Sequence, residues 1–550
     1  MNWVLFVVLG FCIFYLLERR KYLKKLLEYK KVIRMSWGKV KEFERFDFGK
    51  IGRYHKNILP EENVFQILSD QICKDLDFEE LFKYIDRTHS KIGQQYLYYR
   101  LRTIKKEKAI SQENLAKHFQ SDNVFREQIQ LLLNRLSNVE GYYFETLFND
   151  KNIQKPNSIK WVYALSILSL VITIVIFIYP IALVLLIPIL LTNLFFHYRN
   201  KVFIYEHFKA IVEFSKTYNV AKKILKNNKI RELYGEPEFM KHLAKIERKA
   251  SFFKINKRFE NEWLLLIWIP IEYLKISFNL EYIAFYSLIR SFFNCRNDVQ
   301  KLYVFIGEIE VSLTIASLRS EGRENCIPKF YDEKTLVVEN MYHPLLKKCV
   351  SNSINLLNES LLLTGTNMSG KTTFIRTIGV NSILAQTLGI CYASSYIAPF
   401  LRIHSSIRIA DDLLEDTSYY LKEVLVLKEF VESVNESVPC LFILDEIFKG
   451  TNSQERVSAG YAILDYLNQS KHIVLVATHD LELVNLLECR NYAVYHFQEQ
   501  IMSKELNFDF KIKKGKMTKQ NAIEILELYN YPKKITDTAY LLKYNVFKIK

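Results

Sequence analysis

Residues 361–379 of this chain read L-L-L-T-G-T-N-M-S-G-K-T-T-F-I-R-T-I-G. The short apolar run Leu361–Leu363 leads into a loop bounded by Gly365 and Gly370, and a helix is predicted from about Thr373. Glycine at both ends permits the tight turn in which backbone N–H groups point at phosphate oxygens, and the helix N-terminus adds partial positive charge. The stretch therefore predicts a strand, a phosphate-binding loop and a helix.

The residues of this loop are predicted to bind a nucleotide. Lys371 would reach the β- and γ-phosphates, and the hydroxyl of Thr372 would ligate Mg²⁺. ATP and Mg²⁺ are the expected cofactors. The predicted nucleotide-binding residues are Gly365, Thr366, Asn367, Met368, Ser369, Gly370, Lys371, Thr372 and Thr373.

Two later strand ends supply the other groups that an ATPase needs. The apolar run Cys440–Leu444 ends in Asp445 and Glu446. Asp445 is predicted to hold Mg²⁺, directly or through water, and Glu446 to orient and deprotonate the attacking water. The next predicted strand, Ile473–Ala477, is followed by His479, which could hydrogen-bond the γ-phosphate. Together these side chains predict hydrolysis of ATP by water.

The composition fits a globular protein that also contains membrane segments. Of the 550 residues, 49% are hydrophobic and 25% are charged, and the formal net charge is +16. This positive charge suits either nucleic acid or the cytoplasmic face of a membrane, and charge alone does not choose between them. The eight cysteines form no C-x-x-C pair and no cluster with histidine, so they are interpreted as reduced core residues.

The first seventeen residues carry no charge and are followed by Glu18-Arg19-Arg20-Lys21. Because the positive charge follows the apolar run, the charge order predicts a membrane anchor at residues 1–20 and not a cleaved signal peptide. The basic flank would then face the cytoplasm. A helix at the membrane surface, or one buried in the protein, is the alternative.

A second uncharged run spans residues 161–198, about twice the length that one bilayer crossing needs. Tyr179-Pro180 falls near its middle and both flanks are basic, which predicts a transmembrane hairpin with both ends in the cytoplasm. The alternative is a soluble hairpin that is buried on every face. A shorter apolar run, Trp263–Ile271, is interpreted as core or as a membrane-surface contact.

The rest of the N-terminal half is predicted to be helical, after a linker at residues 21–62. Apolar residues recur at three- and four-residue spacing in Val64–Arg102, Asn123–Phe148 and Glu206–Ile230. Lysines along these helices suit either a solvated face or contacts with phosphate groups.

Further short motifs accompany the phosphate loop in a fixed order. They are Y-I-D-R-T-H-S-K-I-G at 84–93, His343-Pro344, I-R-I-A-D-D-L at 407–413, T-S-Y-Y-L-K-E at 417–423, L-D-E-I-F-K-G-T-N at 444–452 and A-T-H-D at 477–480. With T-G-T-N-M-S-G-K-T-T at 364–373, they resemble the MutS family of DNA mismatch repair proteins, whose ATPase domain is of the ABC type. The resemblance extends over roughly residues 64–550.

The resemblance implies a multidomain fold with α and α/β parts. Residues 63–342 would form an all-α, MutS-like core and lever domain that carries the transmembrane hairpin 161–198. Residues 343–550 would form the ABC-type P-loop α/β ATPase domain. In that family two ATPase domains pair, and each site takes a signature-loop serine from the other subunit, which implies a homodimer. The predicted catalytic residues are Glu446, Lys371, His479 and, carried over by position, Ser418.

The chain also departs from the family pattern. Thr366 and Ser369 replace the usual proline and glycine of the phosphate loop, changes that should preserve nucleotide binding. Tyr419 and Tyr420 follow Ser418 in an altered signature loop, which bears on the hydrolysis rate. Residues 1–62 are too few for the family's mismatch-recognition domain, so direct mismatch reading is not expected.

These observations predict a multi-pass protein of the inner (cytoplasmic) membrane whose ATPase domain faces the cytoplasm. One hypothesis is an ATP-switched, DNA-binding dimer related to mismatch repair, which recognises DNA by backbone or structure. The alternative is an ATP-driven conformational switch in a membrane complex, in contact with the lipid bilayer and without DNA.

Overall fold

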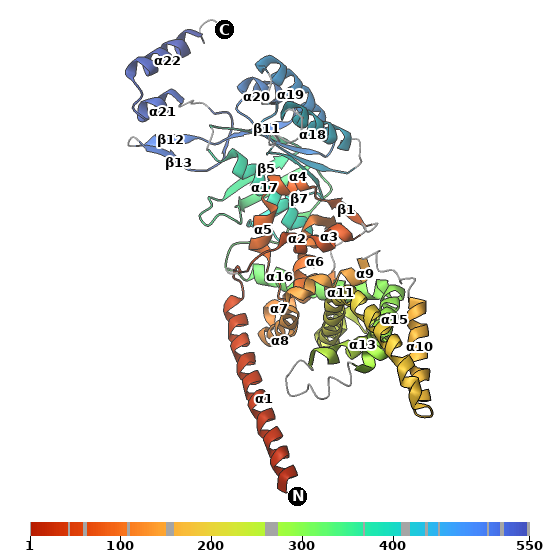
Figure 1. Cartoon of the computed structure of the whole chain (residues 1–550). Helices are drawn as coiled ribbons and strands as arrows, with labels where there is room; N and C mark the ends of the chain where they lie inside the picture. Colours follow the sequence, from red (N-terminus) through yellow and green to blue (C-terminus); the bar gives the residue numbers. More distant parts are fainter. Residues whose placement is uncertain are drawn as a thin grey trace. The chain divides into compact units, whose positions relative to one another are not determined.

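The chain divides into two compact units, each assembled from separate parts of the sequence (Figure 1). Unit 1 comprises Met1–Pro60, Ile85–Tyr99 and Lys108–Glu321, and unit 2 comprises Glu61–Tyr84, Arg100–Glu107 and Gly322–Lys550. The computed structural model describes residues 2–41, 44–58, 63–106, 110–149, 159–258, 273–366, 369–408, 419–434, 438–448, 452–502, 505–517 and 522–546. The predicted combination of a helical part and an α/β part is confirmed.

Unit 1 is built from helices around one long buried helix, α16 (Arg296–Arg319), which packs against α7, α11 and α13. Its Tyr303 lies in an aromatic cluster, with ring centroids 4.5 Å from Tyr54 and 5.4 Å from Phe148. The other helices of unit 1 are α1 (Asn2–Ser36), α2 (Phe48–Ile51), α3 (Arg53–Asn57), most of α6 (Lys91–Arg102), α7 (Ile110–Ser121), α8 (Asn123–Leu133), η1 (Asn134–Leu136), η2 (Val139–Tyr143), α9 (Thr146–Asn149), α10 (Ile159–Ile176), η3 (Pro180–Ala182), α11 (Leu183–Ile224), α12 (Asn228–Tyr234), α13 (Glu238–Arg258) and α15 (Leu280–Asn294).

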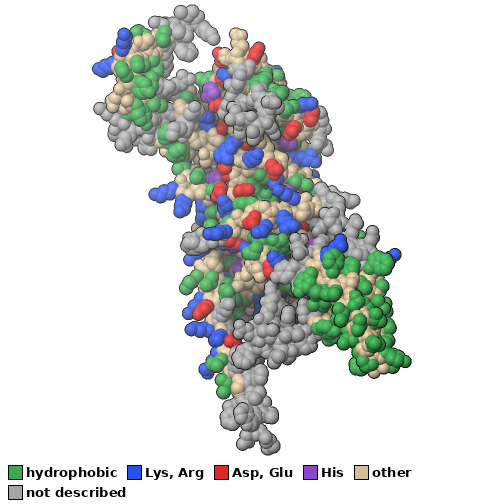
Figure 2. Space-filling model, viewed as in Figure 1, with side chains coloured by type: hydrophobic (Ala, Val, Ile, Leu, Met, Phe, Trp, Pro, Cys, Tyr) green, Lys and Arg blue, Asp and Glu red, His purple; other side chains and the backbone are tan. Residues whose placement is uncertain are grey.

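Helices α10 and α11 form the hairpin expected from the uncharged run. The segments Ile159–Ile176 and Pro180–Arg199 are long and apolar enough to cross a membrane, and only 22% of each is buried within the protein. Figure 2 shows hydrophobic side chains gathered over this hairpin. These are criteria of length and composition, so the membrane crossing stays a prediction. The anchor predicted at residues 1–20 lies within α1, where most side chains before Leu16 fall outside the described residues.

A buried polar contact fixes the hairpin to the turn before α15. Asn193 of α11 is fully buried, and its Nδ2 donates to the carbonyl oxygen of Ser277 at 2.8 Å. Asn279 adopts a left-handed backbone (φ 47°) and donates from its Nδ2 to Asn193 Oδ1 at 2.7 Å. Paired amide and carbonyl groups of this kind satisfy polar atoms that would be costly to leave unpaired in an apolar helix pair.

Unit 2 contains the predicted parallel sheet. The six strands lie in the order β14-β11-β6-β10-β9-β8, and all neighbours pair in parallel except β14 with β11. The strands are β6 (Ser360–Thr364), β8 (Arg402–Ser406), β9 (Cys440–Asp445), β10 (Ile473–Ala477), β11 (Tyr492–His496) and β14 (Lys513–Lys514). Strands β6, β9 and β10 fall where the apolar runs predicted them. They are buried at nearly every position because both faces of the sheet are covered.

A second sheet of four strands has the order β3-β7-β4-β5, and two further pairs are two-stranded. The strands of these sheets are β3 (Lys329–Phe330), β4 (Thr335–Met341), β5 (Asn352–Leu357), β7 (Ser395–Ala398), β1 (Val64–Ile67), β2 (Thr103–Lys105), β12 (Glu499–Met502) and β13 (Glu505–Phe508). The helices of unit 2 are α4 (Asp70–Asp75), most of α5 (Phe78–Ile85), α17 (Lys371–Thr387), α18 (Tyr419–Ser433), α19 (Ser453–Leu467), α20 (Leu481–Leu487), α21 (Ala522–Leu528) and α22 (Lys533–Val546).

The range predicted to be all-α, 63–342, also contains strands, and it contributes to both units. Val64–Ile67 forms β1, which pairs with β2 instead of starting a helix. The side chain of Gln66 explains this position, because its Oε1 accepts from Ile403 N at 2.9 Å and its Nε2 donates to Ile403 O at 2.7 Å. A contact between residues 337 positions apart leaves no local pattern in the sequence.

Two histidines of unit 2 should make the fold sensitive to acid. Burial lowers the pKa of His343 to about 4, and burial likewise lowers the pKa of His404 to about 4. The unfolded chain takes up these protons near pH 6.5, so it binds more protons than the folded protein between pH 6.5 and 4. Stability therefore falls as the pH is lowered through this window, by about 2 kcal/mol per histidine between pH 7 and 5.

Denaturant unfolding of the full chain at pH 7 and pH 5 would measure this loss. His404 stacks on the ring of Phe442 with centroids 5.2 Å apart, so His404→Phe keeps an aromatic ring and removes the titrating group. We expect this variant to lose about 2 kcal/mol less than the wild type between the two pH values. Equal pH dependence in wild type and His404→Phe would contradict the expectation.

Candidate nucleotide-binding site

The loop between β6 and α17 requires glycine at both of its ends. Gly365 has φ 146°, and a Cβ atom there would lie 2.8 Å from Ser369 Oγ and 2.9 Å from Phe497 O. Gly370 has φ 103° and is the N-cap residue of α17. Other residues rarely adopt these backbone angles, and the close approach at Gly365 leaves no room for a side chain. The two ends of the loop thus have backbone angles that favour glycine.

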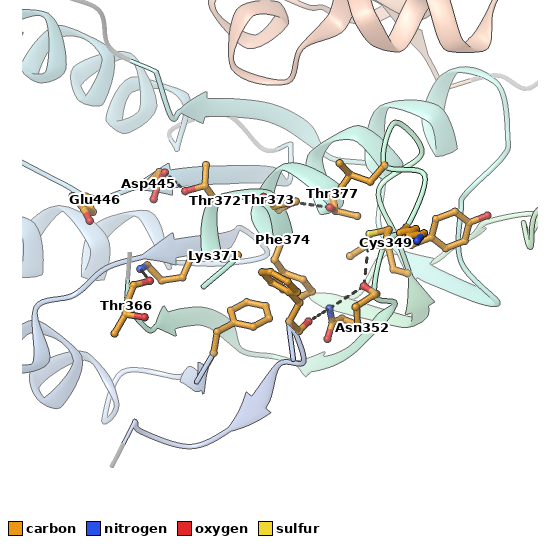
Figure 3. Close-up of a pocket in the computed structure, with 18 residues that line it drawn as sticks. Cys349, Asn352, Thr366, Lys371, Thr372, Thr373, Phe374, Thr377, Asp445 and Glu446 are labelled. Atoms are coloured by element: carbon orange, nitrogen blue, oxygen red, sulfur yellow. Dashed lines mark hydrogen bonds between the residues drawn. The ribbon is translucent and has the colours of Figure 1, made fainter. Parts of the chain in front are cut away.

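Lys371 and Ser369 present polar atoms inside this loop. Lys371 is 5% exposed, and its Nζ donates to Gly365 O at 2.6 Å and to Thr366 O at 2.9 Å (Figure 3). Ser369 is 2% exposed, and its buried Oγ has no hydrogen-bond partner among the residues that the structure describes. A buried ammonium group and an unsatisfied hydroxyl next to a helix N-terminus form a suitable environment for phosphate oxygens.

The acidic pair at the end of β9 lies beside the start of α17. The hydroxyl of Thr372 donates to Asp445 Oδ2 at 2.6 Å. Glu446 has a left-handed backbone (φ 61°), and its N–H donates to Ala477 O at 2.8 Å, which ties it to the neighbouring strand β10. His479 follows that strand, and its Nδ1 lies 3.0 Å from Glu446 Oε1. The four side chains therefore converge from three segments that are far apart in the sequence.

Thr372 and Asp445 fit the ligands of a magnesium ion. Their oxygens are adjacent, and Mg²⁺ commonly takes one or two protein oxygens and completes its shell with water and substrate phosphates. Within the part of the chain that the structure describes, no group of three or more His, Cys, Asp or Glu residues could enclose a metal ion. A metal at this place would therefore depend on the bound phosphates.

A cavity of about 520 Å³ opens at these residues, a size typical of small-molecule sites. Thr366, Lys371, Asp445 and Glu446 lie on one side of it, Cys349 and Asn352 lie on the other, and the ring of Phe374 lies between them (Figure 3). The rings of Phe374 and Phe497 meet at 5.8 Å in an edge-on arrangement. The lining residues are Met341, Tyr342, Leu346, Lys348, Cys349, Val350, Asn352, Thr366, Gly370, Lys371, Thr372, Thr373, Phe374, Thr377, Asp445, Glu446, Phe497 and Phe510.

Most of the predicted site residues come together here. The cavity is lined by Thr366, Gly370, Lys371, Thr372, Thr373, Asp445 and Glu446, with Gly365 and Ser369 in the same loop. His479 contacts Glu446 but does not line the cavity. The predicted nucleotide-binding residues Asn367 and Met368, and the predicted catalytic residue Ser418, lie outside the described residues.

Sequence reasoning missed an ion pair that holds the segment carrying His479. Arg456 of α19 donates from Nε to Asp480 Oδ2 at 2.8 Å and from Nη2 to Asp480 Oδ1 at 3.0 Å. A two-bonded pair of this kind fixes orientation as well as distance. The partners are 24 positions apart with no motif joining them, and the aromatic rings Phe497 and Phe510 likewise follow no recognisable pattern.

Arg456→Ala should slow hydrolysis of ATP without preventing binding. Loss of the paired hydrogen bonds to Asp480 frees the segment that places His479 beside Glu446, and we expect a rate about tenfold lower. Steady-state hydrolysis and nucleotide affinity, measured on the same preparation, separate the two effects. Arg490→Ala removes another partly exposed arginine of unit 2 and should leave both values unchanged. A normal rate in Arg456→Ala would show that the pair does not position the site.

The arrangement of loop, helix and acidic strand end agrees with the comparison to known protein families. Residues 361–546 match the family model for MutS domain V. The C-terminal part of this chain is similar to MutS domain V. The match covers the parallel sheet from β6 onward, including the loop before α17, Asp445, Glu446 and His479. The resemblance seen in the motifs is thus confirmed.

Individual MutS proteins are similar over a longer stretch. DNA mismatch repair protein MutS of Staphylococcus epidermidis is 30% identical over 276 residues, which are 48% of this chain and 31% of that protein. MutS protein homolog 4 of Homo sapiens is 26% identical over 321 residues, 54% of this chain and 32% of that protein. The similarity thus spans about a third of the length of the curated MutS relatives.

Proposed function

We propose that this protein binds and hydrolyses ATP, and that the nucleotide switches its conformation. The observation that carries the proposal is the convergence of Lys371, the Thr372–Asp445 pair and Glu446 on one cavity. The similarity to MutS domain V adds support, because the matched residues 361–546 contain all of these groups. P-loop, ABC-type chemistry is the mechanism that fits them.

Each side chain has a defined task in this mechanism. Lys371 Nζ would exchange its hydrogen bonds to Gly365 O and Thr366 O for oxygens of the β- and γ-phosphates. Thr372 and Asp445 would hold Mg²⁺, which when bound neutralises phosphate charge. Glu446 would accept a proton from the water that attacks the γ-phosphate in line, and His479 would hold the Glu446 carboxylate in place.

The active form in this proposal is a homodimer in which Ser418 of one subunit completes the site of the other. Mixing Lys371→Ala with Ser418→Ala tests this, because each variant alone has both sites defective. A heterodimer regains one intact site, so hydrolysis should return to about a quarter of the wild-type rate after random exchange. No recovery, with heterodimers shown to form, would contradict a shared site.

DNA is the proposed partner of this dimer. The support is that the relative of Staphylococcus epidermidis is named a DNA mismatch repair protein, and that the chain carries a net charge of +16. We infer that the protein recognises DNA by its backbone or its structure. The test is the ATPase rate of the detergent-solubilised protein with duplex, mismatched or four-way-junction DNA, using Glu446→Gln as the blank. A rate indifferent to every DNA would overturn the proposal.

A membrane switch is the second candidate, and the exposed apolar hairpin α10–α11 favours it. In this reading the chain spans the inner membrane several times, the ATPase part faces the cytoplasm, and ATP-driven motion moves the hairpin in the lipid bilayer. Deletion of residues 161–198 distinguishes the two candidates. A soluble variant that keeps full DNA-dependent hydrolysis would argue against the membrane switch. The wild type, reconstituted in liposomes, would show changes in protease accessibility when nucleotide binds. If the deletion variant lost these changes, the membrane switch would be favoured.

A further inference from the structure

Two cysteines of unit 2 face each other across an isolated antiparallel bridge. Cys326 N donates to Cys391 O at 2.9 Å, and Cys391 N donates to Cys326 O at 3.0 Å. Residues that exchange both hydrogen bonds in this way have Cα atoms about 5.5 Å apart. Disulfides usually join Cα atoms about 4.4 to 6.8 Å apart. The backbone therefore already holds these cysteines within bonding range.

The two thiols differ in exposure and in reactivity. Both are free, but Cys391 is fully buried whereas Cys326 is partly exposed. A hydrogen bond from the Cys391 side chain lowers the pKa of the Cys326 thiol, against the opposing effect of burial. The thiolate is the reactive form, and partly exposed cysteines with a lowered pKa are the ones oxidised first. Cys326 is thus suited to attack an oxidant, and Cys391 to attack Cys326.

We propose that Cys326 and Cys391 are a redox modification site, at which a peroxide converts the two thiols into a reversible disulfide. The Cys326 thiolate attacks one peroxide oxygen, the O–O bond breaks, and Cys326 becomes a sulfenic acid while the other oxygen leaves as water or an alcohol. Cys391 then attacks the Cys326 sulfur, an S–S bond forms, and water leaves. The two thiols together lose two electrons, which the peroxide accepts.

The disulfide would join two segments that border the phosphate-loop helix. Asn381 of α17 accepts a hydrogen bond from Tyr392 N at 2.7 Å, directly beside Cys391. Arg323, three residues before Cys326, lies over the ring of Tyr342 at 4.7 Å, and Tyr342 lines the cavity. The covalent loop closed by the bond would contain β4, β5, β6 and all of α17. Oxidation would thus restrain the part of unit 2 that carries Lys371 and Thr372.

The other cysteines offer internal comparisons. Burial raises the pKa of Cys73 to about 11 and that of Cys440 to about 11, so these thiols stay protonated and unreactive near neutral pH. Cys349 lines the nucleotide cavity and lies on neither strand of the bridge. The proposal goes beyond ATP hydrolysis, and it can be tested whether or not the protein hydrolyses ATP.

The test uses the full-length protein, treated with hydrogen peroxide at neutral pH, alkylated and digested without reducing agent. Mass spectrometry should find the peptides of Cys326 and Cys391 joined, with loss of two hydrogen atoms, and dithiothreitol should restore both thiols. Cys326→Ser should abolish the linked peptide, and Cys349→Ser should retain it. The oxidised wild type should unfold roughly 5 °C higher than the reduced protein, and Cys326→Ser should show no such difference.

Three results would overturn the proposal. In the first, Cys326 is oxidised to sulfinic or sulfonic acid and forms no disulfide. In the second, Cys326 or Cys391 forms a disulfide with another cysteine, and in the third, both thiols stay intact while peroxide is consumed. Because the wild-type protein alone gives these outcomes, a failure of Cys326→Ser to fold does not affect the conclusion. Cys391→Ala then provides the second variant, and it should leave Cys326 oxidised but unlinked.

Discussion

Replacement of Lys371 with alanine is expected to weaken ATP binding at least about 100-fold. The Lys371 ammonium lies inside the phosphate loop, 2.6 Å from Gly365 O and 2.9 Å from Thr366 O, and is 5% exposed. Alanine removes the positive charge that would face the β- and γ-phosphates and leaves two carbonyl oxygens pointing at them. The loss should therefore appear in affinity, and hydrolysis should fall with it at any accessible ATP concentration.

A fluorescent ATP analogue, titrated against the purified protein, measures this change. Lys348→Ala is the matched control, because Lys348 also lines the cavity but is exposed and lies outside the loop. We expect less than a threefold change in that variant. An unchanged unfolding midpoint for Lys371→Ala would show that the loss is local. ATP binding with wild-type affinity in Lys371→Ala would mean that nucleotide binds elsewhere or that the loop does not contact phosphate.

Local sequence patterns predicted many of the strands of unit 2, but they predicted fewer of the contacts between distant parts of the chain. The apolar runs at Leu361–Leu363, Cys440–Leu444 and Ile473–Ala477 are strands β6, β9 and β10, because buried parallel strands are apolar on both faces. The two glycines of the predicted phosphate loop can be understood in a similar way, since positive φ angles at Gly365 and Gly370 restrict the residue type directly.

Contacts between distant residues could not be predicted in the same way. Asp75 of α4 is fully buried and accepts hydrogen bonds from Ser405 Oγ at 2.8 Å and from Arg408 N at 2.9 Å. It lies in a stretch that reads as an ordinary amphipathic helix, and its partners follow about 330 positions later. The pairs Arg456–Asp480 and Cys326–Cys391 are of the same kind. A single sequence shows which residues are suited to pair, but not which partner the fold brings to them.

For the hairpin, the local composition predicted the two helices but not the residue at which the second helix ends. Its composition predicted two apolar helices, and α10 and α11 are those helices. The continuation of α11 to Ile224, with Pro188 inside it, was not predicted, because the charged residues after Tyr198 suggested an end. A helix can pass from an apolar to a charged environment without a break, since its backbone hydrogen bonds do not depend on the surroundings.

Replacement of Glu446 with glutamine is expected to lower ATP hydrolysis at least about 100-fold while ATP binding is kept. Glutamine has the shape of glutamate and can still accept a hydrogen bond from His479, whose Nδ1 lies 3.0 Å from Glu446 Oε1. It cannot accept the proton of the attacking water, so only the step that needs a base is lost. The backbone position is unchanged, because the φ of 61° at residue 446 and the bond to Ala477 O do not involve the side chain.

Single-turnover hydrolysis and nucleotide affinity, measured side by side, separate this effect from that of Lys371→Ala. The two variants should be complementary, since one loses affinity and the other loses only the chemical step. Glu488→Gln removes an exposed carboxylate of the same unit that pairs with Lys516 and should hydrolyse ATP at the wild-type rate. If Glu446→Gln retained more than about a tenth of the wild-type rate, another group would have to act as the base. His479, which follows β10 and contacts Glu446, would then be the residue to replace next.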